Sequence, residues 1–386
     1  MHRSDNLFFT NRLTPQELRA RTRVRSSDAT DSRGHYFRDT TAIVHSSAFR
    51  RMKHKTQVFF APKNDHVCTR IEHVMHVATI AATICRALDL DPDLAWAIGL
   101  GHDLGHTPFG HLGETILATT RGSDGFRHEM YSLRVVDKLA NHGRGLNLTY
   151  AVRDGIVNHN GERFEQSLVP DHEYKDPASI TRRDRVPSTW EGVIVRMSDK
   201  IAYLGRDLED AMRLGLVSAD QMPATGRDIL GTKNAEIIDA LVGDLIGTSL
   251  KTGAVGFSDR IYEAFLAMKD FNYRNIYASP QLANYHQYFE RILMTLYDYL
   301  GELATRLGTD FARYAEEGNT LAARFGEYRR KFAPLYETER SAPTDVVFDY
   351  VAGMTDEFAI QCMREITVPQ EFSAQFDRVV LGSSGD

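Results

Sequence analysis

The chain has little cysteine, no long apolar run and no overall positive charge. Its three cysteines among 386 residues stand far apart, and no Cys-x-x-Cys pair occurs. This pattern excludes a disulfide framework and a zinc site built on thiolates. No apolar run reaches the length that a transmembrane helix needs, so we expect no contact with a membrane. The N-terminus lacks the apolar core of a signal peptide, and we therefore expect a cytoplasmic protein.

The formal net charge of −6 provides no global cationic field that would attract nucleic acid or anionic lipid. The charge is nevertheless uneven, because residues 1–55 contain 12 Lys and Arg against 5 Asp and Glu. We interpret the arginines from Arg19 to Arg25 as part of a solvated basic arm, and we expect a phosphate-facing surface nearer Arg50. Binding of single-stranded nucleic acid by this basic region remains an alternative.

Most of the chain has the apolar spacing of α-helices, and strand signals are sparse. Between residues 69 and 90, apolar side chains recur every three or four residues. Asp91 and Pro92 then read as a helix N-cap followed by proline at the first helical position. A further helix is expected to start at Ser198 and to end at Gly215.

Some segments are ambiguous or lack a helical pattern. The short apolar runs 56–60 and 192–197 fit either a strand or part of a helix. Loops are expected over 160–190 and over 218–234. The first of these loops is long, charged and contains three prolines, so we interpret it as an inserted element over a site.

The fold class that follows is all-α, a helical bundle with a C-terminal helical extension. No internal repeat, low-complexity tract or clear linker divides the chain. We expect three parts. Residues 1–34 form a basic, partly flexible arm, residues 35–334 form the catalytic helical domain, and residues 335–386 form a helical extension and tail.

Histidine is crowded into one part of the chain, since nine of the fifteen lie within residues 66–159. The densest unit begins with the adjacent pair His102 and Asp103. Neighbours on a regular helix point about 100° apart, so both side chains reach one ion only near a helix end or a local distortion. Gly101 and Gly105 flank the pair and make such a distortion easy.

Two ligands do not make a metal site, but two other expected helices offer more. The helix over 69–90 contains His73, and the helix expected to start at Ser198 brings Asp199. Two nitrogens and two oxygens from three helices are a usual metal-binding set in a helical bundle. This mixed set suits manganese or magnesium, with iron, nickel, cobalt and zinc as other options.

Other histidines in this stretch have simpler explanations. We interpret His76 as a core or surface histidine rather than a ligand. His66, His142 and His159 stay undecided between the two roles. An isolated His-Asp dipeptide is a weak signal, whereas an ordered set from three helices is much harder to reach by chance.

At these residues the sequence resembles the HD superfamily, and more narrowly the deoxyguanosine triphosphate triphosphohydrolase family and the related deoxynucleotide triphosphohydrolases. The resemblance spans about residues 35–280, and its stretches agree in order and spacing. The stretches are Phe49-Arg50-Arg51-Met52, Lys55-Thr56-Gln57-Val58, Thr69-Arg70-Ile71-Glu72-His73, Gly101 to His111 with Gly113-Glu114, Phe126-Arg127-His128-Glu129, Asp199-Lys200-Ile201-Ala202-Tyr203 with Asp207, and Lys269-Asp270-Phe271 through Tyr277. The fold that the resemblance implies is an HD-domain helical bundle.

The resemblance also implies a reaction, in which a deoxynucleoside triphosphate gives a deoxynucleoside and inorganic triphosphate. It implies that a divalent metal ion is held by His73, His102, Asp103 and Asp199. The acid–base and phosphate-site residues that it implies are His111, Glu114, His106 and His128. The triphosphate contacts are Arg70, Lys200, Tyr203 and Lys269, and the deoxyribose is read by Gln57, Asp207 and Tyr277. Relatives form homo-oligomers, so the resemblance implies one here, while a nucleotide effector stays open.

These residue types suit the implied chemistry. A nucleoside triphosphate carries about four negative charges, which a metal ion and nearby cations must offset before water attacks. The departing 5′ oxygen is a poor leaving group and needs a proton, for which His111 is our candidate. Glu114, one helical turn away, would set the tautomer of His111. Activation of the attacking water by the same two residues fits equally well.

One departure and two alternatives accompany this interpretation. Lys269 stands where some relatives carry arginine, and lysine cannot make a bidentate fork. The chain could instead be another HD-type phosphohydrolase, acting on a nucleoside monophosphate or a cyclic nucleotide. It could also be a nucleotide or single-stranded nucleic-acid binding protein without activity. The number of cations favours a triphosphate, and the intact acid–base pair favours an enzyme.

Overall fold

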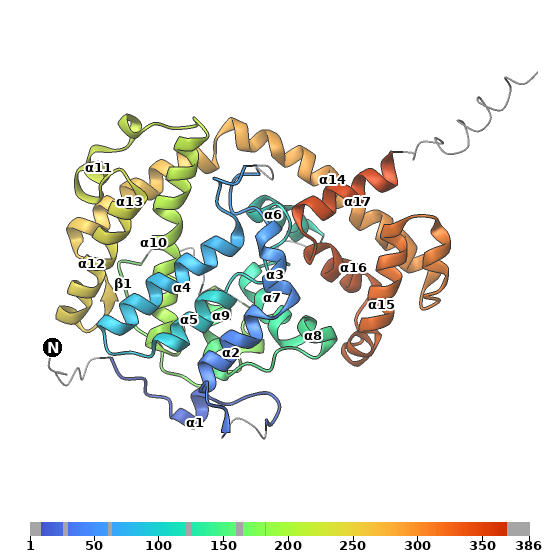
Figure 1. Ribbon diagram of the computed structural model, residues 1–386, viewed down its shortest axis with the longest axis horizontal. Coiled ribbons are helices and arrows are strands. Elements are labelled where there is room, and N and C mark those ends of the chain that lie inside the picture. Colours follow the sequence, from blue (N-terminus) through green and yellow to red (C-terminus); the bar gives the residue numbers. More distant parts are fainter. Residues whose placement is uncertain are drawn as a thin grey trace, which may run out of the picture.

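Figure 1 presents the computed structural model, which describes residues 9–25, 30–60, 64–120, 125–159, 165–181 and 183–368. Within these residues the fold is all-α, as predicted, apart from one small antiparallel ribbon. The ribbon joins β1 (Ser167–Leu168) to β2 (Val255–Gly256). Within the described ranges, no helix is long and apolar enough to cross a membrane.

The helices form a central bundle with a group on each side (Figure 1). The bundle contains α2 (His35–Val44), α4 (Arg70–Ala87), α5 (Pro92–Gly101), α7 (His128–Arg134), α9 (Tyr150–Asn158) and α10 (Trp190–Arg213). One flanking group is α11 (Ala224–Leu230), α12 (Asn234–Thr252) and α13 (Asp259–Asn272). The other is α14 (Pro280–Leu307), α15 (Thr320–Glu339), α16 (Pro343–Ala352) and α17 (Asp356–Thr367). The described residues also form short helices, namely α1 (Pro15–Leu18), α3 (Ser47–Arg51), α6 (Gly110–Thr119) and α8 (Ala140–Gly143).

The starts of α4 and α5 follow from local sequence. The Thr69 backbone N–H donates to Glu72 Oε2 at 2.8 Å, which completes a capping box at the start of α4. The Asp91 carboxylate accepts from the backbone N–H groups of Asp93 and Leu94, and proline follows at the first helical position of α5. The helix over 69–90 was therefore predicted to within three residues at each end, and the start of α5 was predicted correctly.

The predicted start of α10 at Ser198 is wrong. The helix begins at Trp190, where the Thr189 hydroxyl accepts from the Gly192 backbone N–H at 3.1 Å. The ambiguous run 192–197 lies in the first turns of this helix and is buried on all sides. A segment without a solvent-facing side lacks the regular alternation of apolar and polar faces that reveals the helical period, and this hid the true helix start.

The expected loop over 218–234 is also wrong, because it contains α11. This helix is short and is held by tertiary contact, since a Cβ at Gly226 would lie only 2.4 Å from the sulfur of Met268 on α13. Local sequence carries little of that information. The run 56–60 forms no strand, and its one ladder contact is an isolated bridge between Thr56 and Thr69.

The long loop over 160–190 is irregular where it is described, apart from β1 and a 3₁₀ turn over Pro177–Ser179. Residues 160–164 and 182 lie outside the described part. The loop runs back to the bundle, where the Asp154 carboxylate accepts from the Ser188 backbone N–H at 2.6 Å. Its end is thereby fixed to α9.

Close contact between α4 and α5 places the site. A Cβ at Gly99 would lie 2.7 Å from the Cα of Ala78, so only glycine permits this approach of the two helices. Core residues from α4, α5, α9 and α10 belong to one hydrophobic cluster. The polar ends of these helices are therefore rigidly placed around a common point.

The two ends of the chain support the bundle in different ways. The Arg21 guanidinium is 4% exposed and pairs with buried Asp39 at 2.6 Å, so this part of the basic arm is not solvated as expected. At the other end, Asp356 on α17 accepts from the backbone N–H groups of Thr56 and Phe109 at 2.8 and 2.9 Å. The boundary expected at residue 334 falls inside α15, and the division into three parts stays a prediction.

Candidate active site

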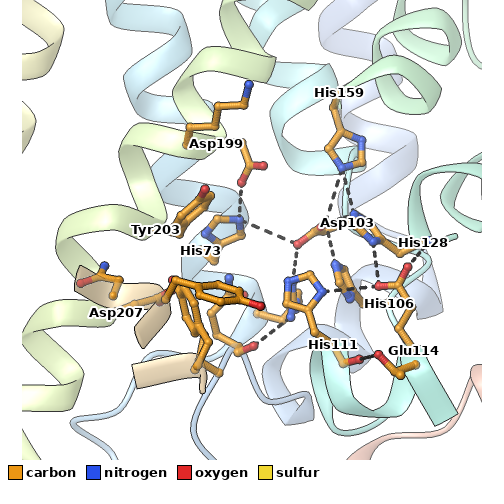
Figure 2. Close-up of a pocket in the computed structure, with 18 of the residues that line it drawn as sticks. His73, Asp103, His106, His111, Glu114, His128, His159, Asp199, Tyr203 and Asp207 are labelled. Carbon is orange, nitrogen blue, oxygen red and sulfur yellow. Dashed lines mark hydrogen bonds and ion pairs between the residues drawn. The ribbon is translucent and has the colours of Figure 1, made fainter. Parts of the chain in front are cut away.

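A cavity of about 1030 Å³ lies where α4, α6, α7, α10 and α13 meet (Figure 2). All but one of the predicted site residues line it. These are Gln57, Arg70, His73, Asp103, His106, His111, Glu114, His128, Asp199, Lys200, Tyr203, Asp207, Lys269 and Tyr277. The exception, His102, is fully buried behind the cavity wall. Residues from six stretches of the chain are thus brought together.

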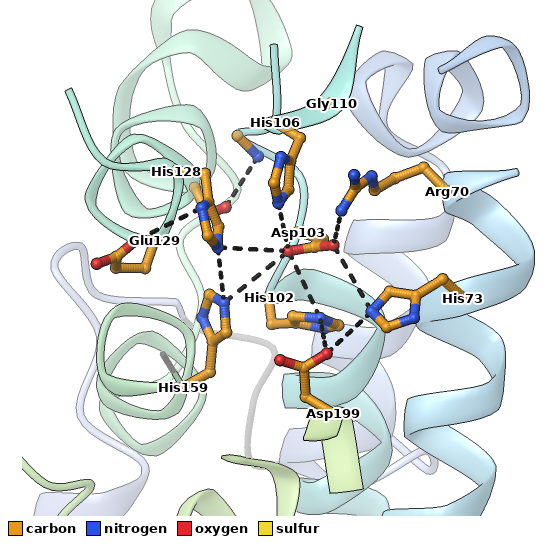
Figure 3. A network of polar contacts seen from close by, with 12 residues as sticks. Arg70, His73, His102, Asp103, His106, Gly110, His128, Glu129, His159 and Asp199 are labelled. Atoms are coloured by element: carbon orange, nitrogen blue, oxygen red, sulfur yellow. Dashed lines mark hydrogen bonds and ion pairs between the residues drawn. The ribbon is translucent and has the colours of Figure 1, made fainter. Parts of the chain in front are cut away.

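The four predicted metal ligands lie within a few ångströms of one another (Figure 3). His73 Nε2 on α4 is 3.0 Å from Asp199 Oδ1 on α10 and 3.8 Å from Asp103 Oδ2. His102 Nε2 is 3.5 Å from Asp103 Oδ1 and 3.8 Å from Asp199 Oδ1. Ligand atoms about 2.1 Å from one ion are themselves about 3 to 4 Å apart, so this spacing suits a shared cation.

The clearest indication that these four residues suit a metal ion is a buried ring nitrogen of His102 that has no hydrogen-bond partner. His102 Nδ1 lies 2.7 Å from the carbonyl oxygen of Gly99, which only accepts, so Nδ1 is the protonated nitrogen. Nε2 of the same ring therefore bears a lone pair, and it is buried without a hydrogen-bond partner. A buried lone pair without a donor is costly unless a cation meets it.

The His102–Asp103 pair leaves the helix as predicted, but one glycine acts differently from expectation. The α5 helix ends at Gly101, and the pair follows immediately. Gly105 is required because a Cβ there would lie 2.2 Å from the backbone nitrogen of Ser132 on α7. It serves close packing rather than an unusual backbone angle.

Arg70 lies on the metal side of the cavity. Its guanidinium donates to Asp103 Oδ2 at 2.6 Å and to the Gln57 carbonyl oxygen at 3.0 Å, and the side chain is 1% exposed. Burial would raise the pKa of Asp103, but His106, His102 and Arg70 outweigh it and hold the pKa well below its ordinary value. Asp103 is therefore an ionised carboxylate at neutral pH. The predicted triphosphate contact of Arg70 stays a prediction.

One side of the cavity, which we call the histidine wall, consists of His106, His111, Glu114, His128 and His159. The rings of His106 and His128 stack with centroids 4.0 Å apart. His111 is two-thirds exposed, with Nδ1 3.5 Å from Glu114 Oε2. Glu114 lies closer to His128, whose Nδ1 is 2.9 Å from the same carboxylate oxygen. The expected pairing of Glu114 with His111 is therefore shared with a second histidine.

The ionisation of this pair is set by burial and mutual charge. Burial alone would lower the pKa of His128, but the nearby carboxylate of Glu114 raises it to about 9. Burial would raise the pKa of Glu114, but the charge of His128 and hydrogen bonds from His111 and His128 hold it well below its ordinary value. The two groups form an imidazolium–carboxylate pair at neutral pH.

The tyrosine wall consists of Tyr203 and Asp207, which Figure 2 shows on the other side of His73 from the histidine wall, and of Tyr277, which contacts Asp207. Tyr203 and Asp207 come from α10, and Tyr277 ends a π-helical segment, Tyr273–Tyr277, that follows α13. Tyr277 Oη donates to Asp207 Oδ2 at 2.6 Å. Burial raises the pKa of Asp207 to about 7, against the opposing effect of this hydrogen bond.

Two lysines and Gln57 also line the cavity. Lys200 Nζ lies 3.2 Å from Glu165 Oε2, a carboxylate from the long loop. Lys269 on α13 also borders this cavity. Gln57 is 6% exposed, and its side-chain carbonyl oxygen is buried without a partner.

Comparison with known proteins agrees with this architecture. The HD domain family matches residues 70–204, and the phosphohydrolase-associated domain family matches residues 255–326 and 319–365. A deoxyguanosinetriphosphate triphosphohydrolase-like protein of Caldanaerobacter subterraneus subsp. tengcongensis is 38% identical over 92% of this chain and 91% of its own length. Proteins of the same name are 39% identical in Desulfatibacillum aliphaticivorans, over 86% of this chain and 87% of theirs, and 31% identical in Clostridium tetani, over 90% of both. The chain belongs to the deoxyguanosinetriphosphate triphosphohydrolase-like family.

As an HD-type phosphohydrolase of this family, the chain holds its buried His/Asp cluster on the elements that the HD domain match covers. His73, the His102–Asp103 pair and Asp199 all fall within residues 70–204. The tyrosine wall combines this region with the phosphohydrolase-associated region, because Tyr277 lies within 255–326. The cavity is therefore built by both matched regions.

Sequence reasoning missed several residues of this family member's site. His159 on the end of α9 was undecided, yet its Nε2 is 3.9 Å from Asp103 Oδ1. Arg183, from the long loop, donates two hydrogen bonds to the carboxylate of Glu129, with Nε–Oε1 and Nη2–Oε2 distances of 2.5 and 3.2 Å. No local pattern identifies these side chains, although the crowding of histidines marked the first.

Proposed function

We propose that this protein is a divalent-metal-dependent hydrolase that converts deoxynucleoside triphosphates into deoxynucleosides and inorganic triphosphate. The observation that carries the proposal is one cavity in which His73 and Asp103 face the tyrosine wall. Its volume of about 1030 Å³ suits a nucleotide rather than a single phosphate. Family membership and the names of the relatives support the same substrate class.

The metal ion would be held by His73, His102, Asp103 and Asp199, with manganese or magnesium as the expected metal. The bare, buried Nε2 of His102 supports this set. When bound, such an ion polarises a phosphoryl oxygen and lowers the pKa of a water molecule. The remaining steps belong to side chains of this chain.

Two groups would handle charge and protons. Lys200 and Lys269 line the cavity and would offset the negative charge that builds on the triphosphate. His111 is exposed to the cavity, with Glu114 beside it, and would protonate the departing 5′ oxygen. The same pair would serve as the base for the attacking water if the roles were reversed. His106 and His128 would line the phosphate site.

The tyrosine wall would recognise the sugar. Asp207 and Gln57 offer oxygen acceptors for a 3′-hydroxyl, and Gln57 has a buried acceptor without a partner. Tyr277, packed beneath C2′, would leave no space for a 2′-hydroxyl. A buried hydroxyl without a partner would also cost about 1–3 kcal/mol.

The test is product analysis with each of the four dNTPs and with their mixture, in Mn²⁺ or Mg²⁺. We expect a deoxynucleoside and tripolyphosphate in equal amounts, with little turnover of ribonucleotides. Single substrates report base preference, and faster turnover in the mixture would indicate a nucleotide effector. Release of orthophosphate, or turnover of only monophosphates or cyclic nucleotides, would refute the proposal. Salt-dependent oligonucleotide binding without hydrolysis would favour a binding protein.

Light scattering tests the homo-oligomer that the family resemblance implies.

A further inference from the structure

We propose that Arg183, from the long loop over 160–190, is a positioning residue for the proton-transferring side chains of the histidine wall, and that it acts through Glu129. The inference rests on the proposed function, because those side chains would transfer the proton in the reaction described above. Arg183 lines the same cavity, and no step of that reaction uses it.

Arg183 and Glu129 form a buried ion pair with two hydrogen bonds. Glu129 follows His128 in the first turn of α7 and is 1% exposed. The guanidinium donates from Nε to Oε1 at 2.5 Å and from Nη2 to Oε2 at 3.2 Å. An ionised carboxylate at this depth is costly unless a cation meets it, and two parallel bonds fix the orientation of both groups. Arg183 therefore neutralises Glu129 and holds it in place.

Glu129 bears on the reaction because it competes with Glu114 for one ring nitrogen. His128 Nδ1 lies 2.9 Å from Glu114 Oε2 and 3.7 Å from Glu129 Oε2. Figure 3 shows Glu129 beside the ring of His128. The single hydrogen on Nδ1 makes a short, straight bond to only one carboxylate at a time. Because Arg183 holds Glu129 beyond hydrogen-bond distance, the ring of His128 donates to Glu114.

The choice of carboxylate decides how Glu114 meets His111. Glu114 Oε1 accepts from the backbone N–H of His128 at 3.1 Å, and Oε2 accepts from its ring, so both oxygens are held. The same Oε2 lies 3.5 Å from Nδ1 of His111, the proposed proton donor. Nη2 of Arg183 is 3.5 Å from Glu114 Oε1, so the guanidinium borders both carboxylates. If His128 turned to Glu129, Glu114 would lose the bond that keeps Oε2 beside His111.

Contacts on both sides of Arg183 in the sequence hold the long loop in position. The carbonyl oxygen of Arg185 accepts from Nη1 of Arg196 on α10 at 3.0 Å. Nη2 of the same guanidinium, which is 3% exposed, donates to Glu165 Oε1 at 2.8 Å. One buried side chain of α10 therefore binds the loop before and after Arg183.

The first test is steady-state hydrolysis of dGTP by Arg183→Gln. The matched control is Arg185→Gln, because that side chain lies on the same loop and is 55% exposed. We expect kcat of Arg183→Gln to fall about 10- to 100-fold, as for other outer partners that orient a histidine. KM and bound metal should stay near their wild-type values, and Arg185→Gln should resemble the wild type. A rise in KM alone would indicate direct contact with the triphosphate and would overturn the inference, as would an unchanged kcat.

A double variant shows whether Arg183 acts through Glu129. Glu129→Gln removes the charge that competes for His128, so Arg183→Gln combined with Glu129→Gln should be no slower than Arg183→Gln alone. The second substitution also removes a buried charge without its cation, and it therefore guards against poor folding of the single variant, which circular dichroism would detect. Losses in kcat that multiply would show independent roles for the two residues and contradict the inference.

A crystal structure of Arg183→Gln tests the arrangement independently of turnover. We expect Nδ1 of His128 to lie within hydrogen-bond distance of Glu129 and beyond that distance from Glu114. Retention of the bond to Glu114 would overturn the inference while the proposed function stands. A wild type that hydrolyses no deoxynucleoside triphosphate would refute the proposed function, whereas the change of partner in the variant would still be expected.

Discussion

The two walls of the cavity are built differently. Apart from His111, the residues of the histidine wall are buried, and the rings of His102, His128 and His159 are held through defined contacts. The tyrosine wall has one strong internal bond, between Tyr277 and Asp207, and Tyr277 belongs to a π-helical segment outside the central bundle. The difference indicates two separate roles. The bundle positions the residues that would bind the metal and transfer protons, whereas the flanking region determines which substrate fits.

The difference between the two walls predicts different effects for variants on each of them. Changes to the metal ligands should lower both metal content and turnover, whereas changes to the acid–base residues of the histidine wall should lower turnover alone, because preorganised charge acts mainly in the transition state. Changes to the tyrosine wall should alter KM and sugar selectivity while metal content stays constant. A tyrosine-wall variant that loses its metal would contradict this separation.

The largest effect is expected for His102→Ala and Asp103→Ala. Each removes a proposed ligand, and turnover of dGTP should fall about 10³-fold or more together with bound metal. Turnover is followed by chromatography of deoxyguanosine, and metal content by elemental analysis. His76→Asn serves as the control and should resemble the wild type. A variant that is metal-free but active would refute the ligand assignment.

The next effect concerns proton transfer on the histidine wall. His111→Ala should keep its metal and bind substrate, yet lose about 10²- to 10⁴-fold in kcat, because a general acid or base is removed. Single-turnover kinetics with a separate binding measurement distinguishes the chemical step from substrate affinity. An unchanged kcat would remove His111 from the reaction.

Sugar selectivity should change less. Tyr277→Ala opens space beside C2′ and frees Asp207, so the ratio of kcat/KM for dGTP over GTP should fall about 10-fold, equivalent to about 1.4 kcal/mol. Metal content should stay at the wild-type level. Equal rates for GTP and dGTP in the wild type would contradict the sugar-reading role altogether.

A pH dependence of binding should accompany this wall. The pKa of Asp207 is raised to about 7, so its carboxylate becomes protonated and loses an acceptor as the pH falls below 7. KM for dGTP should therefore rise as the pH falls from 8 to 6, and Asp207→Asn should flatten this profile. The contribution of Asp207 to the stability of the folded state has the opposite pH dependence. Because folding raises the pKa of this carboxyl group, its contribution to stability is lost as the pH rises through 7. A KM that is constant with pH in the wild type would count against ionised Asp207 as the sugar acceptor.

The smallest effect is expected for Lys269→Arg. Both lysine and arginine would place a positive charge in the cavity at this position. KM for dGTP should change by no more than about 3-fold, although the two groups differ in hydrogen-bond geometry. A much larger change would mean that Lys269 makes a specific single contact that the arginine fork disrupts.

The sequence allowed prediction of the features that have a local or ordered pattern. The apolar spacing over 69–90 predicted α4, the Asp91–Pro92 pair predicted the start of α5, and the crowded histidines with the His102–Asp103 pair marked the metal side. The start of α10 was mispredicted because its first turns are buried on all sides. The expected loop that contains α11 was wrong because tertiary contact with α13 stabilises that helix.

The rest of the site depends on contacts between distant residues. His159 is brought to Asp103 by the packing of α9 on the bundle, and Arg183 reaches Glu129 from a loop 54 residues away in sequence. Neither contact has a spacing that a single sequence reveals. The shared role of Glu114 likewise appears only when α6 and α7 are placed side by side.

The most direct test of this account is a crystal structure of the Mn²⁺-loaded protein with anomalous scattering measured near the manganese edge. We expect a peak bonded to His73, His102, Asp103 and Asp199 at about 2.0–2.3 Å from each ligand atom. An anomalous map without a peak at this point, or with these four side chains bound to no common ion, would contradict the account.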